Sequence, residues 1–247
     1  MVIRSQARVE GVVSVSVRYD DGAVHEYAFE GLRLADFEGS VPWRTMRSYL
    51  GQRHYSGSYA SATMGGFVVH ESRLELARLL LADFDPRVRL IYAQPFLLVA
   101  RVGGRMRRHV PDFLLVHAGG TATLVNVKPA GLLAEEEIAQ ALAWPGAVAE
   151  RHGWEYEVWS GADATLLANV RFLAGYRRPG LVPRALVERA WEAVRDGERV
   201  AQVEGRLADG GPGCSVRPAL LALLWSGRLT TDLSVPLSGE SVLRRSA

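Results

Sequence analysis

Two glycine pairs divide the middle of the chain and constrain its fold more than any other feature. Gly103-Gly104 and Gly119-Gly120 separate three β-rich runs, at residues 90–101, 105–116 and 121–128. Glycine pairs between strand-like runs are typical of tight turns, so the pattern predicts three successive strands in a meander. Such a sheet has to be covered by helices from the flanking sequence.

Helical patterns lie on both sides of the predicted meander. Residues 70–86 carry a run of leucines that stops at Pro86, and residues 132–152 return to a helical pattern. One more strand at 154–160 and one more helix at 163–174 follow. This order of elements predicts an α/β fold, in which helices flank a mixed sheet.

The two ends of the chain show different patterns. Residues 12–18 alternate with the two-residue period of a half-buried strand, and the Asp21-Gly22 turn after them predicts a β-hairpin. Near the other end, the glycine- and proline-rich segment 175–184 precedes three short helical patterns and two short strands around Ser238-Gly239. Three helices followed by a β-wing predict a winged-helix-like domain.

These patterns divide the chain into three expected parts. Between the N-terminal hairpin and the α/β core, residues 41–66 are rich in arginine, aromatic residues, serine and glycine, and they show no clear period. We expect that stretch to be irregular. The expected domains are the hairpin with the basic and aromatic segment, the α/β core, and the winged-helix-like domain, at residues 1–55, 56–178 and 179–247.

Composition limits the class of protein. A formal net charge of +2 on 247 residues is too small for a purely electrostatic DNA coat, so nucleic-acid binding has to rest on local patches. The single cysteine, Cys214, excludes an internal disulfide and fits a reducing compartment. No run reaches the roughly 18 apolar residues of a membrane span, and the N-terminus lacks a signal-peptide stretch. We therefore expect a cytoplasmic protein without a membrane partner.

Lys128 is the sole lysine of the chain; the other 28 of its 29 basic residues are arginines. Because side chains alternate along a strand, Lys128 and Asn126 point to the same face. An odd-length loop centred on Gly120 would place Asp112 opposite Lys128 and bring an acid, an amide and an ammonium together. A two-residue loop at the glycine pair would instead place Asp112 opposite Val127 and scatter the group.

Such a cluster has the chemistry of a magnesium site. Mg²⁺ takes oxygen ligands, typically one or two carboxylates with substrate phosphate and water, and a nearby lysine can orient water or stabilise developing charge. The preceding helix offers Glu71 and Glu75, four residues apart and so on one face. Each residue also has a structural interpretation: Asp112 as a turn residue, Glu75 as a surface partner of Arg78, and Lys128 as a snorkelling side chain.

A glutamate on a helix, then Pro-Asp, then (Asp/Glu/Gln)-x-Lys on the next strand is the signature of the PD-(D/E)xK nucleases. The segments "YSGSYASATMGG", "ESRLELARLLLADFDP", "AQPF", "RRHVPDF" and "VNVKPA" resemble, in this order, the TnsA-type endonuclease subunits of heteromeric bacterial transposases, especially an actinobacterial group. The resemblance covers residues 42–178. It implies a restriction-endonuclease-like fold and Mg²⁺-dependent hydrolysis of DNA at transposon 5′ ends, with Mn²⁺ as a substitute metal.

The resemblance also implies partners and roles for individual residues. The partners are double-stranded DNA at the transposon ends, a DDE-type transposase subunit and an AAA+ ATPase regulator. The catalytic acid falls on Glu75, the metal-binding aspartate on Asp112 and the catalytic lysine on Lys128, with Glu71 as an outer ligand or an alternative acid. Asn126 stands where the family has Asp, Glu or Gln; its amide oxygen remains a metal ligand, although a neutral one on a short stem.

Two basic clusters are candidate DNA contacts. Arginine forks suit phosphate oxygens, and aromatic rings stack on unpaired bases. The alternatives are a surface loop docked on the core for the first cluster, and a strand edge protected by charge for the second. The residues are Arg44, Arg47, Arg53 and His54 among Trp43, Tyr49 and Tyr55 in the first cluster, and Arg105, Arg107, Arg108 and His109 in the second.

Two alternatives to an active transposase nuclease stay open. Asn126 motivates a catalytically weak or inactive module that keeps the nuclease fold to bind DNA and to assemble the transposase. A stand-alone restriction or repair nuclease of the same superfamily is the other. The C-terminal part has mixed charges, which favours docking on a partner protein over tight DNA binding.

Overall fold

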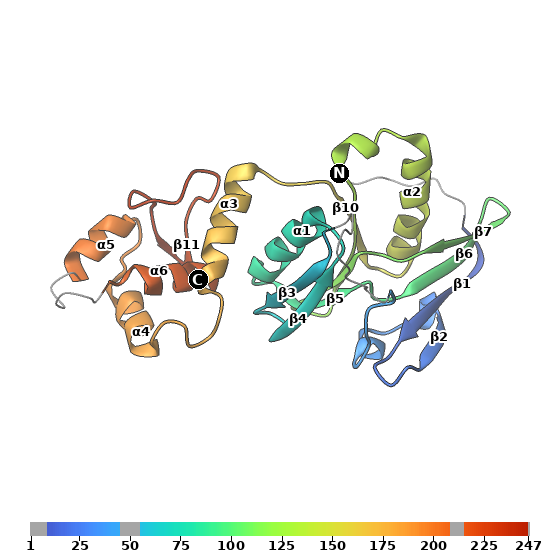
Figure 1. Cartoon of the computed structure of the whole chain (residues 1–247), viewed down its shortest axis with the longest axis horizontal. Helices are drawn as coiled ribbons and strands as arrows, with labels where there is room; N and C mark the ends of the chain where they lie inside the picture. The colour runs from blue at the N-terminus through green and yellow to red at the C-terminus, as the bar shows by residue number, and fades with distance from the viewer. Residues whose placement is uncertain (1–8, 45–54, 208–214, 247) are drawn as a thin grey trace. The chain divides into compact units, whose positions relative to one another are not determined.

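The chain forms a mixed α/β structure in which several β-sheets are flanked by helices (Figure 1). It is a computed structural model that describes residues 9–44, 55–207 and 215–246. The chain divides into a first unit of Met1–Ala82 and Arg87–Gly161 and a second unit of Asp83–Pro86 and Ala162–Ala247. This division precedes the glycine- and proline-rich segment where the sequence predicted a boundary, so the helix after Gly161 belongs with the second unit.

One four-stranded antiparallel sheet of the first unit contains the N-terminal hairpin. Its strands run in the order β2, β1, β6, β7, with bounds Val24–Ala28, Val9–Arg18, Leu97–Val102 and Arg105–His109. Because β1 pairs with both β2 and β6, the N-terminal hairpin is part of a larger sheet of the first unit. Its apolar residues pack with those of the second sheet in one core cluster.

The second four-stranded sheet carries the strands nearest to the candidate site. It runs in the order β10, β9, β8, β5, with bounds Glu155–Trp159, Ala122–Val127, Phe113–His117 and Val88–Ala93. The β9–β10 pair is parallel and the other pairs are antiparallel. All six residues of β9 are buried, so both faces of the central strand are covered.

The expected three-strand meander is wrong, because two of its runs are each split between the two sheets. Residues 90–101 form the end of β5 and most of β6, and residues 105–116 form β7 and most of β8. Pro95 and Pro111 lie at the breaks, and proline has no N–H to donate to a strand ladder. The glycine turns are correct; the chain changes sheets at the prolines.

The β8–β9 hairpin has a register that the sequence did not predict. Phe113 pairs with Val125 and Val116 pairs with Ala122, so the five-residue loop is centred on Gly119, not on Gly120. The regular pairing ends at Phe113, and the N–H of Asp112, just before the strand, donates to the carbonyl of Val125. Asp112 therefore does not oppose Lys128, and that expectation is wrong.

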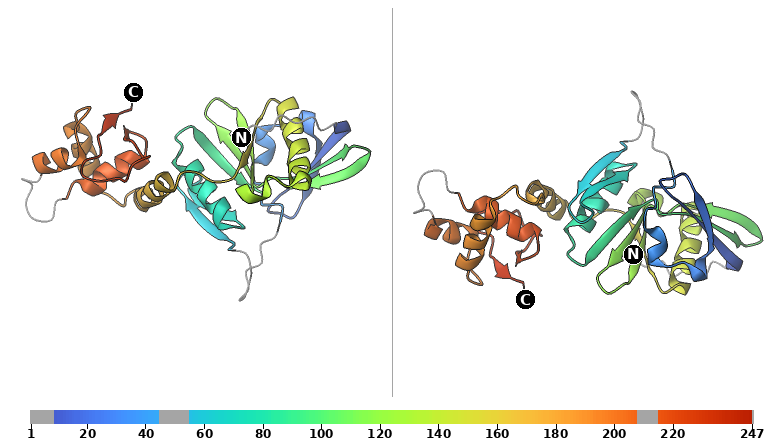
Figure 2. Two further views of the ribbon diagram at one scale, coloured as in Figure 1. Left: turned by 90° about the horizontal axis from the view of Figure 1, so that it is seen from above. Right: turned by 90° about the horizontal axis from the view of Figure 1, so that it is seen from below.

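Helices cover the sheets of the first unit. The helix α1 spans Arg73–Phe84 and α2 spans Glu136–Arg151, somewhat shorter than the patterns in the sequence. Helix α2 packs on β10, β9 and β1 (Figure 2). Short 3-10 helices in the chain occupy Phe29–Gly31, Leu34–Phe37, Ala130–Leu132 and Ala174–Tyr176.

A further hairpin lies in the segment that was expected to be irregular. Strands β3 and β4, at Gly57–Ser61 and Gly66–His70, form a two-stranded antiparallel sheet. The serines, glycines and alanines of β3 hide its period from a reading of hydrophobicity. His70, the last residue of β4, leads directly into the N-terminus of α1.

The second unit is mostly helical. Its helices are α3, α4, α5 and α6, and its strands β11 and β12 pair with each other; the bounds are Ala164–Leu173, Arg184–Ala193, Val200–Leu207, Arg217–Trp225, Leu229–Thr230 and Arg244–Arg245. The two strands expected around Ser238-Gly239 are replaced by a loop between β11 and β12. Asn169 of α3 holds that loop, donating to the carbonyls of Leu233 and Val235 and accepting from the Leu237 N–H. In the part of the chain that the structure describes, no helix is long and apolar enough to cross a membrane.

Candidate functional site

Asp112 is the centre of the candidate site. Its backbone N–H donates to the Val125 carbonyl over 3.0 Å, and its carbonyl accepts from the Gln94 N–H over 2.8 Å. The side-chain oxygen Oδ2 accepts a 2.6 Å hydrogen bond from the Val127 N–H. Within the described residues, no hydrogen bond engages Oδ1. The backbones of two strands therefore hold the carboxylate and leave one oxygen available.

Burial raises the pKa of Asp112 to about 6. The hydrogen bond from the Val127 N–H opposes this rise, the negative charge of Glu75 adds to it, and the positive charges of Lys128 and Arg44 lower it. These interactions place Glu75, Lys128 and Arg44 within electrostatic reach of Asp112. Glu75 and Lys128, which the sequence singled out for catalysis together with Asp112, thus both lie near this desolvated carboxylate.

Glu75 sits in the first turn of α1 and caps the helix. The Ser72 hydroxyl donates to Oε1 of Glu75 over 3.0 Å and accepts from the Glu75 N–H over 3.0 Å. The other oxygen, Oε2, accepts from the Glu71 N–H over 2.7 Å. This arrangement is a variant of the capping box: the Ser72 hydroxyl accepts from the Glu75 N–H, but the Glu75 carboxylate accepts from the N–H of Glu71 rather than from that of Ser72. Both Glu75 oxygens therefore have partners, and a metal ion has to share them.

Glu71 lies before the helix, because α1 begins at Arg73. The expectation that Glu71 and Glu75 share a helix face is wrong for this reason. Instead, Glu71 Oε2 accepts from Arg44 Nη1 over 3.0 Å in a partly exposed ion pair. That contact gives Glu71 the role of holding a cation near Asp112.

Gln94 connects Arg44 to Asp112, because it bonds to the backbone of both residues. Its φ of 47° is positive, which no other non-glycine residue among those described shares, and its side chain is 3% exposed. Its side-chain oxygen accepts from the Arg44 N–H over 3.2 Å, and its carbonyl accepts from the Trp43 N–H over 2.9 Å. A strained backbone persists only where its surroundings hold it in place. The contacts that hold Gln94 also link the backbone of Arg44 to that of Asp112.

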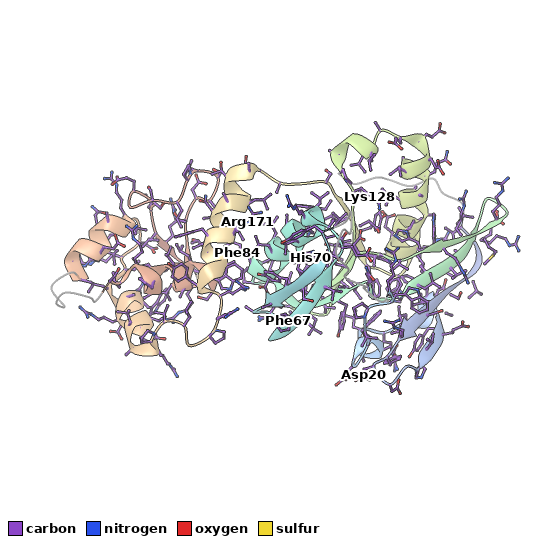
Figure 3. The ribbon with its side chains drawn as sticks, viewed as in Figure 1. Asp20, Phe67, His70, Phe84, Lys128 and Arg171 are labelled. Carbon is purple, nitrogen blue, oxygen red and sulfur yellow. The ribbon has the colours of Figure 1, made fainter. Side chains whose placement is uncertain are left out.

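Lys128 follows β9 and extends the parallel pairing with β10. Its N–H donates to the Trp159 carbonyl over 2.9 Å, so the backbone at this position is held by the sheet. Its positive charge lowers the pKa of both Asp112 and His109. Figure 3 labels the Lys128 side chain. The lysine that is unique in the sequence thus lies within electrostatic reach of Asp112, whose pKa is raised the most among the described carboxylates of the first unit.

Asn126 lies at the centre of a buried hydrogen-bond chain. Its Oδ1 is 2.7 Å from His109 Nε2, and its Nδ2 donates to the Tyr156 hydroxyl over 2.9 Å. The Tyr156 hydroxyl donates in turn to the Leu142 carbonyl over 2.7 Å. The sequence identified Asn126 as a third oxygen ligand for a metal ion, but the structure directs this oxygen to His109.

His109 is the inward-pointing residue of β7. Burial lowers the pKa of its imidazole to about 4, the hydrogen bond with Asn126 opposes this, and the charges of Lys128 and Arg44 lower the pKa further. The imidazole is neutral at pH 7 as a result. Because Oδ1 of Asn126 can only accept, Nε2 of His109 carries the proton. The edge of the His109 ring also packs against Trp144 of α2.

The candidate DNA contacts divide into described and undescribed residues. Arg105, Arg107 and Arg108 lie exposed on β7, an edge strand, and within the described part of the chain none of them pairs with a carboxylate. Arg44 is held at the site by Glu71 and Gln94. Arg47, Arg53 and His54 lie outside the described residues.

The donor set fits one hard cation better than a cluster of metals. Among the described residues, no group of three or more His, Cys, Asp or Glu side chains is arranged to hold a metal ion. Two carboxylates, Asp112 and Glu75, do lie within electrostatic reach, and the charge of Glu75 raises the pKa of Asp112. Mg²⁺ commonly takes one or two carboxylates and completes its shell with water and substrate phosphate, so these residues fit it.

Two residues of the site were missed or underrated in the sequence. Gln94 precedes a proline, which disfavours the α region but does not indicate a positive φ or a contact with Arg44. Tyr156 lies on a predicted strand, 30 residues after Asn126, and no local pattern indicates that its hydroxyl reaches that amide. Both contacts are long-range, and only the folded chain brings them together.

Comparison of the sequence with protein-family models and with curated proteins finds no match. The geometry of the site, together with the motif spacing, therefore carries the functional proposal.

Proposed function

We propose that this chain is a Mg²⁺-dependent DNA endonuclease, the subunit of a heteromeric transposase that cleaves the transposon 5′ ends. One observation carries this proposal. Glu75 and Lys128, which are 53 residues apart in sequence, both interact electrostatically with the buried carboxylate of Asp112. Perturbed carboxylates beside cations are typical of catalytic sites. The order and spacing of these residues resemble the TnsA-type nucleases, which supports the same conclusion.

Each of the three residues has a role that follows from its surroundings. Asp112, held by the Val127 N–H, presents Oδ1 as a ligand, and Glu75 supplies a second carboxylate, both of whose oxygens also accept hydrogen bonds at the start of α1. Mg²⁺ bound at these oxygens would polarise the phosphate that is attacked. Lys128 places a compact ammonium there, suited to orient a water molecule or to stabilise charge that develops on the phosphate.

The basic residues supply the substrate contacts in this proposal. Arg44 lies next to Asp112, and the three arginines of β7 lead along an edge strand towards His109. Arginine recognises phosphate oxygens through paired N–H groups, so these residues suit a DNA backbone rather than a particular base sequence. The charge is local, consistent with a protein whose net charge is only +2.

The finer fold and the partners belong to the same proposal. Two sheets with flanking helices around Asp112 and Lys128 support a restriction-endonuclease-like core. Three helices with a small two-stranded sheet after Pro183 support a winged-helix-like second unit, whose mixed charges suit docking on protein partners. We propose a DDE-type transposase subunit and an AAA+ ATPase as those partners, in the bacterial cytoplasm.

The test is cleavage by the assembled complex. Lys128→Ala and Asp112→Ala should each abolish nicking at transposon 5′ ends when the chain is combined with its transposase partner, with Mg²⁺ or Mn²⁺ present. Asp36→Asn, which weakens the ion pair between Arg33 and Asp36 and changes no residue of the candidate site, is the control and should cleave normally. Cleavage of 5′ ends by the complex with both site residues replaced would show that the site is assigned wrongly.

A second candidate function has its own observation. Both oxygens of Glu75 are engaged in the capping box, and the oxygen of Asn126 is engaged by His109. A catalytically weak or inactive module that keeps the nuclease fold to bind DNA and assemble the transposase would need no free ligands. Titration with Mn²⁺ separates the two: binding that Asp112→Ala and Glu75→Ala both weaken favours the nuclease.

A further inference from the structure

We propose that Asn126 is a positioning residue, and not a metal ligand, whose carboxamide joins the two four-stranded sheets of the first unit to α2 through His109 and Tyr156. This inference rests on the proposed function, because what Asn126 positions is the strand end that carries Lys128. It assigns roles to His109 and Tyr156 as well, neither of which touches the reacting atoms.

The geometry carries this role in three contacts. His109 is on β7 of one sheet, and Asn126 is on β9 of the other, so their 2.7 Å hydrogen bond crosses between the sheets. The contact between Asn126 and Tyr156 joins β9 to its neighbour β10. Tyr156 then reaches the carbonyl of Leu142 on α2. Four elements are thus joined by one chain of three hydrogen bonds.

Helix α2 packs closely against the residues that form this chain of hydrogen bonds. Gly146 of α2 faces the Tyr156 ring, and a β-carbon at Gly146 would lie 2.7 Å from a ring carbon. The glycine allows the helix to approach close enough for the hydroxyl to reach Leu142. Trp144 of α2 packs against the ring of His109. The positions of both partners of Asn126 are therefore set by α2.

The carboxamide has little freedom to serve a metal ion. Asn126 is 1% exposed, its amide hydrogens face Tyr156 and its oxygen faces His109. A rotation that turned the oxygen elsewhere would leave His109 and Tyr156 with unpaired buried groups, which is costly. Asn126 also suits this chain of bonds better than an acidic residue, because a carboxylate has no hydrogen to donate to the Tyr156 hydroxyl.

The position of Asn126 explains what the chain of bonds achieves. Asn126 is next to Val127, whose N–H holds the Asp112 carboxylate, and two residues before Lys128. Fixing Asn126 against β7 and α2 fixes both of these groups. Residues that orient a site without touching the substrate commonly change activity by about 10- to 100-fold when they are replaced.

The test uses three variants: Asn126→Ala, His109→Ala and the double variant that carries both changes. Asn169→Ala is the control for all three. Asn169 is also a buried, fully bonded asparagine, so its replacement controls for the loss of stability alone. Measurements are made on the full chain: Mn²⁺ affinity by electron paramagnetic resonance, unfolding free energy by denaturant, and kcat and KM for 5′-end cleavage in the assembled complex well below the unfolding temperature.

We expect Asn126→Ala and His109→Ala to lower kcat by about 10-fold, with KM for DNA and the Mn²⁺ affinity within about threefold of the wild type. The double variant should lose no more kcat and little more stability than either single variant, because both remove the same hydrogen bond. Asn169→Ala should lose stability with kcat unchanged. Asn126→Asp should not bind Mn²⁺ more tightly.

Three outcomes would overturn the inference. A loss of Mn²⁺ affinity in Asn126→Ala but not in His109→Ala, or tighter binding in Asn126→Asp, would make Asn126 a ligand. If both single variants kept the full kcat, the hydrogen bond between Asn126 and His109 would contribute to stability only. Additive stability losses would show that the two residues do not act together. Failure of the proposed function is seen separately, as Mn²⁺ binding that Asp112→Ala leaves unchanged.

Discussion

The two units each bury one asparagine at a hydrogen-bonded junction, and the two residues are used differently. Asn169 bonds only to backbone groups of one loop in the second unit, at Leu233, Val235 and Leu237. Asn126 bonds to two side chains, close to charged residues that shift the pKa values of Asp112 and His109. Burial and full hydrogen bonding are therefore common to a structural and a site residue; the neighbouring charges separate them.

The same contrast holds for the charged residues of the two units. In the second unit, ion pairs lie near the surface: Arg206–Glu198 joins α5 to the turn before it, and Arg217–Glu204 joins α6 to α5. In the first unit, Asp112 is desolvated, and its charge interacts with those of Glu75, Lys128 and Arg44. Surface pairs contribute little to stability, whereas a desolvated carboxylate carries a large free-energy cost that ligand binding can relieve.

The largest expected effect distinguishes the site lysine from the arginines of the chain. Lys128→Arg keeps the positive charge but replaces a compact ammonium with a broad planar fork. We expect it to lower kcat for 5′-end cleavage by at least about 100-fold, the size of loss seen when a transition-state charge contact is removed. If Lys128→Arg retained most of the activity, a positive charge alone would suffice at this position. The site lysine would then not differ in function from the arginines of the chain.

The next effect is the dependence of stability on pH. Because burial raises the pKa of Asp112 to about 6, the folded state holds its proton more tightly than the unfolded state does. Its contribution to the unfolding free energy is present below pH 4 and is lost as the pH rises through about 6, by up to about 3 kcal/mol. Denaturant unfolding from pH 4 to pH 8 without divalent metal should show this decline.

Asp112→Asn is the matched variant for the pH series. It cannot ionise, so the difference in unfolding free energy between the wild type and this variant should change with pH in the same window. A constant difference would mean that Asp112 is ordinarily solvated, and the contrast between the two units would be lost.

An effect of intermediate size compares the junctions directly. Replacing Asn169 with alanine leaves two carbonyls and one N–H of the β11–β12 loop without their partner. We expect a loss of about 2 kcal/mol in unfolding free energy, measured with denaturant. A loss near zero would mean that the loop is held by other contacts, and Asn169 would then be a poor counterpart of Asn126.

A smaller effect concerns the cap of α1. Ser72→Ala removes both hydrogen bonds between the serine hydroxyl and Glu75, and should cost about 1 kcal/mol of stability. It also releases Oε1 of Glu75. If Glu75 is a metal ligand, Mn²⁺ should bind to this variant at least as tightly as to the wild type. Weaker binding would indicate that the cap holds Glu75 in place for the metal.

The smallest effect belongs to an exposed pair of the second unit. Arg199 and Glu240 lie 3.1 Å apart with both side chains largely in solvent. Glu240→Gln should leave the Tm unchanged within the error of calorimetry, because solvent and salt screen such pairs. A clear drop in Tm would show that surface pairs of this unit matter more than their exposure suggests.

The sequence predicted the local elements well and the long-range contacts poorly. The helices α2 to α6 and the strands β1, β9 and β10 form close to where the sequence pattern predicted them. The reason is that the spacing of apolar residues reflects which face of each element is buried. The change of sheet at Pro111 was missed, since a proline signals a break but not where the next strand pairs. The hairpin β3–β4 was missed because small residues carry little hydrophobic signal.

The candidate site was partly visible for the same reason. Residue types and their spacing singled out Glu75, Asp112 and Lys128, whose charges do interact. The register around Gly119, the contact between Asn126 and His109, and the reach of Tyr156 depend on how two sheets and a helix pack. No local pattern specifies such packing, which explains why Asn126 was given a ligand role that its hydrogen bonds do not favour.

The bond between the Val127 N–H and the Asp112 carboxylate has a consequence for related sequences. A backbone donor is supplied by every amino acid except proline, so the hydrogen bond itself tolerates any side chain at position 127 that suits its buried surroundings. Proline is the one residue that would remove the donor and release the Asp112 carboxylate.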